Sequence, residues 1–547
     1  MYNYDNRIIV RNSCIMIKDY TMGECIELEK NFMVWNPLTH RMDILGMYYD
    51  EGTSTLYLPR GLDIYRIKRY LGEKYHTPEP PNDYDTIDNI LIKYTPRDEE
   101  QKQALRFMCG IGEYEENYQL PQLSVNLPTG KGKTYCSIAT IAFLKIKSIV
   151  ITYSNTLLTQ WKENIKEYTN FTEKDILFIS GSPMMNMILN DKSQKARNAK
   201  IFLCTHGTIR SFCDTYGWDK LNEVFKVLGI GMKFIDEAHT NFANMLMLDF
   251  HTNVFKTYYV TATPKRSDWR EDRIYQLSIK NVPYIDLFNE DNDPHTEYIA
   301  IKWNSRPNAM QISECRNMYG LDRNKYVNYV VKQPNFYKMM YIVMDMVIKC
   351  RGRVLFYIGT NEAVLQVYRW IGENYPEFIG DIGIYTSLLS KEDKLKQKNK
   401  KLLLSTTKSA GLGEHIEGLK MTVVLAEPFK SEVLARQSLG RTRDPNTLYV
   451  ELVDLGFKHI RKFYYDKLPI FNKYATSTSD TMIDQYELER RSDKLKEVRV
   501  TKIANSPIRF RDERFFDYSQ EDYREKKVIK PIFFLTRKEN NNDERKS

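Results

Sequence analysis

The chain has 547 residues, of which 42% are hydrophobic and 13% aromatic, so it is long and apolar enough for several buried cores and is not a disordered chain. Its net charge of +9 favours a polyanionic partner without deciding the question. The eight cysteines form no C-x-x-C pair, which argues against zinc and disulfides and for a reducing compartment. No apolar run approaches a membrane span, so we expect a soluble, cytoplasmic protein.

Residues 1–76 predict a small N-terminal domain of mixed α and β structure. Phe32–Trp35 and Thr55–Leu58 have the composition of short strands, and Leu62–Leu71 that of a short helix. The proline-rich stretch after it can continue neither a helix nor a central strand. We therefore predict that residues 77–94 form a linker.

Residues 95–288 alternate short apolar runs with helical patterns. Such runs predict parallel strands that are buried on both faces of a sheet, with helices between them. The predicted strands are Leu123–Leu127, Ser148–Tyr153, Lys200–Thr205, Met232–Ile235 and Tyr258–Thr263. Turn-forming residues at Asn289–Pro294 then end the pattern.

The alternation resumes in residues 295–475, which predict a second α/β domain. Its predicted strands are Arg353–Ile358, Asp381–Tyr385, Lys401–Ser405, Met421–Ala426 and Thr447–Val453. This half has no phosphate-binding loop of its own and is expected to work with the first. Residues 476–547 are rich in Lys, Arg and Glu and predict a charged, partly disordered C-terminal extension.

The stretch Asn126–Thr134 has the composition of a phosphate-binding loop between a strand and a helix. Gly130 and Gly132 allow the backbone to turn so that consecutive N–H groups face one point. Lys133 can reach the β- and γ-phosphates of a nucleotide, and the hydroxyl of Thr134 can bind Mg²⁺. The pattern departs from the usual one at its first position, where Leu127 replaces glycine.

A pair of carboxylates, Asp236 and Glu237, ends the apolar run that begins at Met232. Two adjacent acids at a strand end are costly unless a metal and a nucleophile use them. Asp236 is the candidate ligand of Mg²⁺, and Glu237 can accept the proton of an attacking water. A solvated acidic turn is the weaker alternative.

Asp236-Glu237-Ala238-His239 after a Gly-Lys-Thr loop resembles the DEAH/DEAD-box helicases of superfamily 2. The resemblance covers about residues 95–445. It is nearest to phage and large-virus DNA helicases and to the repair and transcription-factor helicases. It implies two tandem RecA-like domains, a small N-terminal α+β domain that is a candidate for binding nucleic acid, and a cleft for ATP and Mg²⁺.

The resemblance also implies roles for further residues. On the nucleotide side, Gln101 would read adenine and Thr129 would belong to the loop. On the nucleic-acid side or in coupling, the matching positions are Thr156, Gln160, Thr205, His239, Thr261, Thr263 and Thr406. Trp161 belongs to the same segment as Thr156 and Gln160.

Gln437, Arg441 and Arg443 resemble the sixth helicase motif, whose arginine stabilises charge on the γ-phosphate. The motif's second arginine position holds Asp444, so the choice between Arg441 and Arg443 stays open, with Arg441 favoured. The fifth motif departs too, since Gly413 stands where an acid is usual.

The resemblance implies an ATP-dependent DNA helicase that translocates along and unwinds DNA. A virus or phage is the expected source, and the cytoplasm of its host the expected location. DNA is favoured over RNA as partner, and a monomer is expected. The alternatives are a duplex-DNA translocase that does not separate strands, the motor subunit of a restriction system, and an RNA helicase.

Overall fold

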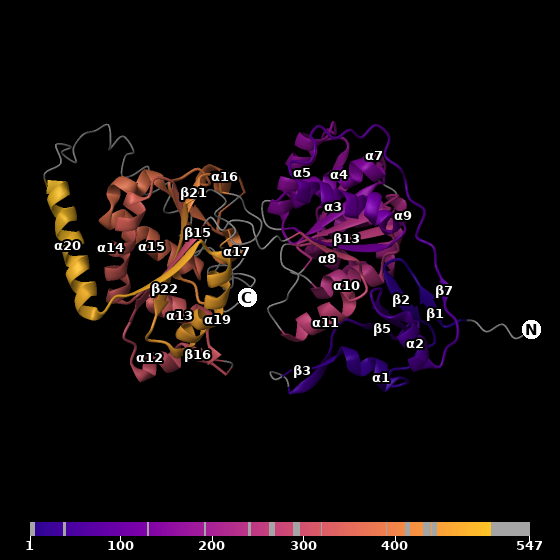
Figure 1. Cartoon of the computed structure of the whole chain (residues 1–547), viewed down its shortest axis with the longest axis horizontal. Coiled ribbons are helices and arrows are strands. Elements are labelled where there is room, and N and C mark those ends of the chain that lie inside the picture. Colours follow the sequence, from indigo (N-terminus) through magenta and orange to yellow (C-terminus); the bar gives the residue numbers. More distant parts are fainter. Residues whose placement is uncertain are drawn as a thin grey trace, which may run out of the picture. The chain divides into compact units, whose positions relative to one another are not determined.

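The computed structural model consists of two compact units that divide between Asp293 and Pro294, and each is described by itself (Figure 1). The structure describes residues 6–36, 40–127, 131–190, 193–238, 242–261, 269–287, 296–318, 320–389, 391–410, 416–429, 439 and 446–504. No helix within these ranges is both long and apolar enough to cross a membrane.

The first unit is built on a seven-stranded parallel sheet with the strand order β10-β11-β9-β12-β13-β8-β14. Its strands are β8 (Gln122–Asn126), β9 (Ser148–Thr152), β10 (Ile176–Phe178), β11 (Ile201–Thr205), β12 (Met232–Asp236), β13 (Lys256–Thr261) and β14 (Tyr284–Asp286). The five longest correspond to the five runs predicted from the sequence. The two edge strands, β10 and β14, have three residues each and were not predicted.

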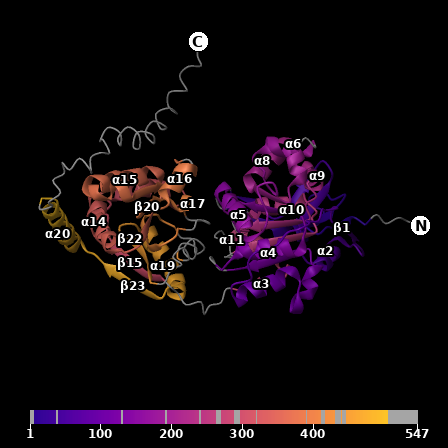
Figure 2. The same ribbon diagram turned by 90° about the horizontal axis from the view of Figure 1, so that it is seen from above.

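Helices cover both faces of this sheet, because successive strand residues point to opposite sides. Val150 packs with α3, α4 and α5, whereas its neighbours Ile149 and Ile151 pack on the other face. Figure 2 shows α3 and α4 on one side and α8 and α9 on the other. The helices are α3 (Glu99–Cys109), α4 (Lys133–Leu144), α5 (Asn155–Tyr168), α6 (Ser182–Leu189), α7 (Gln194–Asn198), α8 (His206–Tyr216), α9 (Asp219–Val227), α10 (Phe242–Phe250) and α11 (Trp269–Ile279).

The N-terminal domain is part of the first unit and shares a continuous hydrophobic core with α8–α11. It contains a mixed sheet in the order β5-β6-β2-β1-β7, a separate β3–β4 hairpin, and helices α1 and α2. A Cβ on Gly61 would lie 2.2 Å from the carbonyl oxygen of Ser278 in α11, so the two parts are in close contact. The elements are β1 (Ile8–Val10), β2 (Cys14–Ile17), α1 (Ile26–Glu29), β3 (Met33–Asn36), β4 (Arg41–Ile44), β5 (Tyr48–Asp50), β6 (Thr55–Pro59), α2 (Ile64–Leu71) and β7 (Thr77–Pro78).

The segment 77–94, which the sequence predicts as a linker, lies along the first unit and is bonded to it throughout. Its first residues form β7, which pairs with β1. Backbone N–H groups of Asp85 and Ile87 donate to the carbonyls of Gly229 and Lys145 at 2.9 and 2.7 Å. We call residues 77–94 the strap, since it fastens the N-terminal domain to the α/β core.

The second unit repeats the architecture with a parallel sheet in the order β19-β20-β18-β21-β22-β15-β23. The strands are β15 (Thr296–Trp303), β18 (Arg353–Ile358), β19 (Ile382–Tyr385), β20 (Leu402–Ser405), β21 (Leu419–Ala426), β22 (Thr447–Asp454) and β23 (Ser477–Met482). The helices include α12 (Ala309–Glu314), α13 (Arg323–Val330), α14 (Pro334–Lys349), α15 (Asn361–Asn374), α16 (Lys391–Gln397), α17 (Thr407–Ala410), α19 (Lys458–Tyr474) and α20 (Gln485–Ala504).

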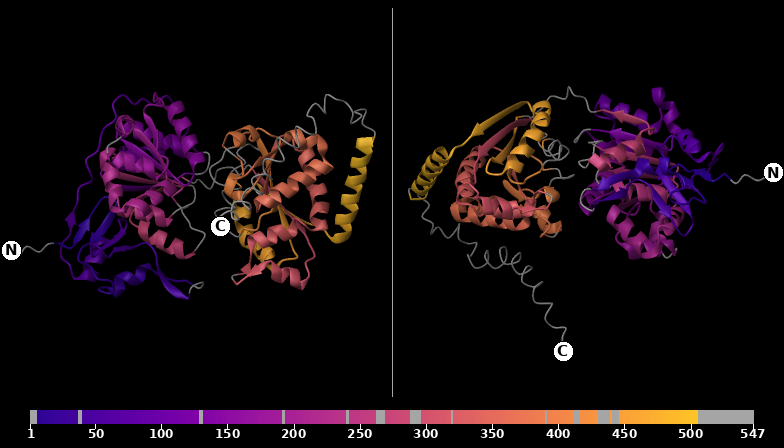
Figure 3. Two further views of the ribbon diagram at one scale, coloured as in Figure 1. Left: turned by 180° about the vertical axis from the view of Figure 1, so that it is seen from behind. Right: turned by 90° about the horizontal axis from the view of Figure 1, so that it is seen from below.

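The sheet of the second unit extends further along the chain than the sequence indicated. Strand β23 and helix α20 lie in the stretch that was assigned to the C-terminal extension. Figures 1 and 3 show α20, in yellow, alongside α14. The predicted fold class is confirmed: the chain is an α/β protein with two seven-stranded, RecA-like parallel sheets and a small N-terminal domain with a mixed sheet.

Candidate functional site: a nucleotide-binding edge of the first sheet

The end of the predicted phosphate loop enters α4 directly. Gly132 precedes the first helical residue, Lys133, and has φ = +88°, a conformation that residues with a Cβ rarely adopt. A Cβ at this position would lie 2.3 Å from Nε2 of Gln101. Both constraints require glycine at position 132. Thr129 and Gly130 lie outside the described residues.

Gln101 supports this loop from α3. Its side chain is buried, and its Nε2 donates to the carbonyl of Lys131 at 3.0 Å, while its Oε1 accepts from the backbone N–H of Arg97 at 2.9 Å. Gln101 is therefore not a surface residue. The described contacts tie it to the loop backbone, and adenine recognition by Gln101 stays a prediction.

The carboxylate pair lies next to the loop. Asp236 is the last residue of β12, and Nζ of Lys133 is 3.1 Å from Oε1 of Glu237. Both side chains of this ion pair are largely buried, with 12% and 13% of their surface exposed. Glu237 has φ = +52°, which is strained for a residue other than glycine and is a feature of functional sites.

Asp236 is buried and forms a hydrogen bond with a residue that is distant in sequence. The indole N–H of Trp161 in α5 donates to Oδ2 of Asp236 at 2.8 Å, and Trp161 is 2% exposed. Burial raises the pKa of Asp236 to about 6, and the adjacent Glu237 adds to this, whereas Lys133 and Trp161 act in the opposite direction. A buried carboxylate of this kind is costly unless a cation compensates for its charge.

These residues suit ATP and Mg²⁺. The N-terminus of the twelve-residue helix α4 presents N–H groups and the positive end of its dipole, which favour a phosphate. Lys133 would bind the phosphates, and Thr134 and Asp236 would bind the cation. No group of three or more His, Cys, Asp and Glu side chains suited to a metal occurs in the described part of the chain.

Other predicted residues of the first unit lie at the same edge, since the carboxyl ends of parallel strands meet there. Thr261 ends β13, and its carbonyl accepts from the N–H of Leu127 at 3.0 Å. Thr205 ends β11 and caps α8 through the N–H of Thr208. Thr156 and Gln160 are partly exposed in α5. Trp161, predicted in the same nucleic-acid segment, instead faces Asp236.

In the second unit, Thr406 follows β20 and accepts from the N–H of Ser409 at the start of α17. A contact that the sequence did not reveal lies beside it. Arg323 binds both carboxylate oxygens of Glu427, at 2.5 and 2.6 Å, and Oγ1 of Thr407 also donates to Glu427, at 3.3 Å. These residues come from three segments, so no local pattern could have indicated the cluster.

Several predicted site residues lie outside the described residues. They are His239, Thr263, Gln437, Arg441 and Arg443. Their roles therefore stay as the sequence predicts them.

Comparison with known proteins gives one family match: residues 93–266 match the family described as type III restriction enzyme, res subunit. No curated protein sequence matches the chain. Among solved structures, UvsW of T4 aligns over 87% of this chain and 99% of its own, with 13% identity and a TM-score of 0.33.

Two further solved structures align with this chain. Dbp5 of S. cerevisiae, bound to RNA and ADP BeF3, aligns over 73% of this chain and 93% of its own, with 15% identity and a TM-score of 0.47. The ATP-dependent type ISP restriction-modification enzyme LlaBIII, bound to DNA, aligns over 80% of this chain and 37% of its own, with 13% identity and a TM-score of 0.47.

Proposed function

We propose that the chain is an ATP-dependent DNA helicase of superfamily 2, because residues 93–266 match the family described as type III restriction enzyme, res subunit, and the sequence motifs resemble that superfamily. ATP hydrolysis would drive translocation along DNA and separation of its strands. DNA is preferred over RNA because the sequence motifs resemble those of DNA helicases.

The observation that carries this proposal is that Lys133, Asp236 and Glu237 lie together at the carboxyl edge of one sheet. Mg²⁺ supplies charge neutralisation of the phosphates when it is bound with ATP. Lys133 holds the phosphates, Asp236 orients the cation, and Glu237 accepts a proton from the attacking water. The ion pair between Lys133 and Glu237 keeps both groups beside the loop before a nucleotide binds.

Arg441 is proposed as the residue of the second unit that stabilises charge on the γ-phosphate. Supply of this charge by the other unit would make hydrolysis depend on closure, and each cycle of closure and opening would advance the strand. Arg443 is the alternative for this role.

The test is ATPase activity measured with single-stranded DNA, duplex DNA, forked DNA and RNA, beside a strand-displacement assay. We expect DNA to stimulate turnover and forked DNA to be unwound, and Lys133→Ala to abolish hydrolysis while the melting temperature is retained. Stimulation by RNA alone would refute the choice of DNA. Nucleic-acid-stimulated turnover that survives in Lys133→Ala would refute the assigned site.

One specific observation favours a second candidate. Residues 93–266 match a family that is named for a subunit of restriction enzymes. The second candidate function is therefore the motor subunit of a restriction system. Such a motor translocates on duplex DNA. Displacement of a triplex-forming strand without unwinding of forked DNA would select this candidate over the helicase.

A further inference from the structure

Helix α2 of the N-terminal domain presents a basic and aromatic face to solvent. Ile67 is buried, and Ile64 and Leu71 pack against the core, at spacings of three and four residues. The opposite side of the helix and the turn after it are exposed. The exposed residues that we call the α2 face are Tyr65, Arg66, Arg69, Lys74 and Tyr75.

Helix α2 is capped at both ends, so the backbone positions of these side chains are fixed. Asp63 caps its N-terminus by accepting from the N–H groups of Tyr65 and Arg66, and Gly72 ends it with φ = +68°. The two tyrosines are 72% and 67% exposed. Nζ of Lys68 lies 5.0 Å from the centre of the Tyr65 ring, so a cation and an exposed ring already lie together on this helix.

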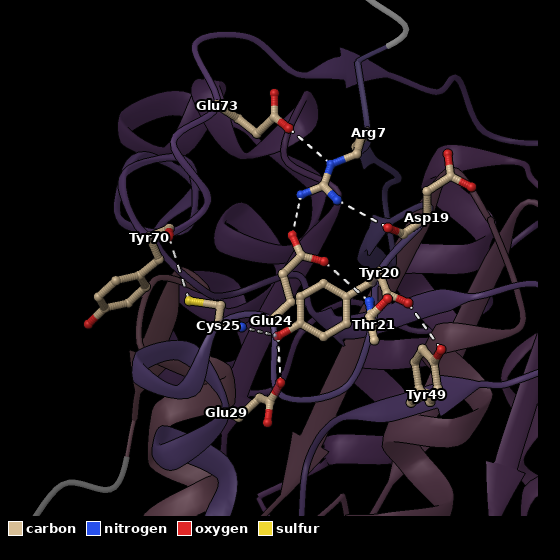
Figure 4. A network of polar contacts seen from close by, with 10 residues as sticks. All are labelled: Arg7, Asp19, Tyr20, Thr21, Glu24, Cys25, Glu29, Tyr49, Tyr70 and Glu73. Atoms are coloured by element: carbon tan, nitrogen blue, oxygen red, sulfur yellow. Dashed lines mark hydrogen bonds and ion pairs between the residues drawn. The ribbon is translucent and has the colours of Figure 1, made fainter.

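The cations of the α2 face have no neutralising partner in the described part of the chain. None of Arg66, Arg69 and Lys74 forms an ion pair with a described carboxylate. The one acid that follows the helix, Glu73, is bound by Arg7, whose Nε lies 3.0 Å from its Oε1 (Figure 4). Arg7 also binds Glu24 at 2.6 Å, and this bond lowers the pKa of Glu24. The network around Arg7 thus leaves the positive charge of the α2 face uncompensated.

From this charge and these exposed rings we infer that the α2 face is a second surface that binds nucleic acid. It is separate from the edge of the first sheet that carries Lys133 and Asp236. Arginine and lysine bind the phosphate backbone, and tyrosine rings supply surfaces on which bases stack. Figures 1 and 2 both show α2 away from α5, the helix that carries Thr156 and Gln160. Nucleic acid is favoured over an acidic protein because the inference rests on the proposed function, in which the chain acts on DNA.

The N-terminal domain is packed onto the α/β core, and this attachment fixes the position of the α2 face within the first unit. The strap and the shared core hold α2 and the loop at Lys133 in one unit. Nucleic acid on the α2 face would therefore be held in a fixed position relative to the nucleotide site of the same unit.

The test uses the full chain with Arg66→Gln, Arg69→Gln and Lys74→Gln combined. Affinity for labelled single-stranded and duplex oligonucleotides is measured by fluorescence anisotropy over a range of salt concentrations, without nucleotide. We expect affinity to fall by at least about tenfold and the slope of log affinity against log salt to become shallower by about 2 to 3, as loss of three phosphate contacts requires. Arg66→Lys with Arg69→Lys should keep the slope.

A matched control removes three cations elsewhere on the same unit, at Lys195, Lys220 and Lys226 of α7 and α9. We expect this control to bind as the wild type does. An equal loss in the control, or an unchanged slope in the α2 variant, would overturn the inference. So would binding of the α2 face to vesicles containing phosphatidylserine without any effect on oligonucleotides.

Because basic residues in the last turn also stabilise a helix, melting curves are recorded for each variant. If the triple variant melts at a lower temperature, Arg69→Gln alone must still make the slope shallower by about one. The binding measurement contains no ATP, so absence of ATPase activity would refute the proposed function and leave this comparison intact.

Discussion

Trp161 donates its indole N–H to Asp236 across 75 residues of sequence, and the bond fixes a buried carboxylate beside Lys133. The pair joins α5, which follows β9, to the end of β12. The helix that carries Thr156 and Gln160 is thereby connected to the site where the cation is expected to bind. We therefore predict that binding of nucleic acid at α5 and binding of the cation at Asp236 are coupled through this hydrogen bond.

Trp161→Phe tests this connection. The smaller phenyl ring fills only part of the buried space, and Asp236 loses a hydrogen bond, so we expect the free energy of unfolding to fall by about 1–3 kcal/mol. We also expect the Mg²⁺ concentration needed for half-maximal ATPase activity to rise. Trp35→Phe is the control, because Trp35 is 47% exposed and lies in the β3–β4 hairpin. Equal behaviour of the two variants would contradict the role of Trp161.

Gly132→Ala should impair the loop for two reasons, the positive φ and the clash with Gln101. We expect the KM for ATP to rise or kcat to fall by at least about tenfold, with a loss of stability of about 1 kcal/mol or more. Gly112→Ala is the control for a positive φ outside the loop, because Gly112 has φ = +65° and its Cβ would meet nothing within 4 Å. ATP kinetics that match between the two variants would contradict the role of Gly132 in the loop.

Ile87→Ala tests whether the strap is structural. Ile87 is 1% exposed, so we expect the substitution to lower the free energy of unfolding of the first unit by about 2–5 kcal/mol. Leu91→Ala, in the same segment, removes a side chain that is 66% exposed and should cost little. A flexible linker would give no difference between the two in denaturant titrations.

The first unit should lose stability in mild acid. Burial lowers the pKa of His251 and of His206 to about 4, whereas histidine in an unfolded chain titrates near about 6.5. Between these values the unfolded state binds more protons, so stability falls as the pH is lowered through this window. At pH 5.5 each histidine should cost about 1 kcal/mol relative to pH 7.5.

His251→Phe should remove about half of that loss. His251 packs against the rings of Tyr48, Tyr57 and Trp218, and its Nε2 is buried without a hydrogen-bond partner in the described structure, so a phenyl ring suits the position. Melting temperatures at the two pH values measure the effect. A variant whose pH dependence equals that of the wild type would contradict the assignment to His251.

Central strands could be predicted from the sequence, because strands buried on both faces are continuous apolar runs. Strand β23 could not, since its residues Ser477–Met482 are exposed and, apart from Met482, polar. It is held by backbone pairing with β15, which leaves no hydrophobic signal. The contacts of the strap could not be predicted either, because its prolines exclude a helix and its backbone groups bond to distant segments.

The local parts of the site were accessible from the sequence, and the distant parts were not. Lys133 and the pair Asp236 and Glu237 belong to short sequence patterns, and each pattern by itself indicates which chemical group its residues would bind. The partners that support them, Gln101 under the loop and Trp161 at Asp236, are set by packing of α3 and α5 on the sheet. For Gln101 the resemblance gave the position but not the contacts.

The core shared by the N-terminal domain and α8–α11 has a consequence for how the chain folds during synthesis. Apolar residues of the N-terminal domain cannot complete their core until α10 and α11, which begin at Phe242 and Trp269, have also been synthesised. The nascent N-terminal segment must therefore wait in an exposed state, where chaperones would bind it. A shortened chain that begins after residue 76 would expose the same surface from the other side and should aggregate.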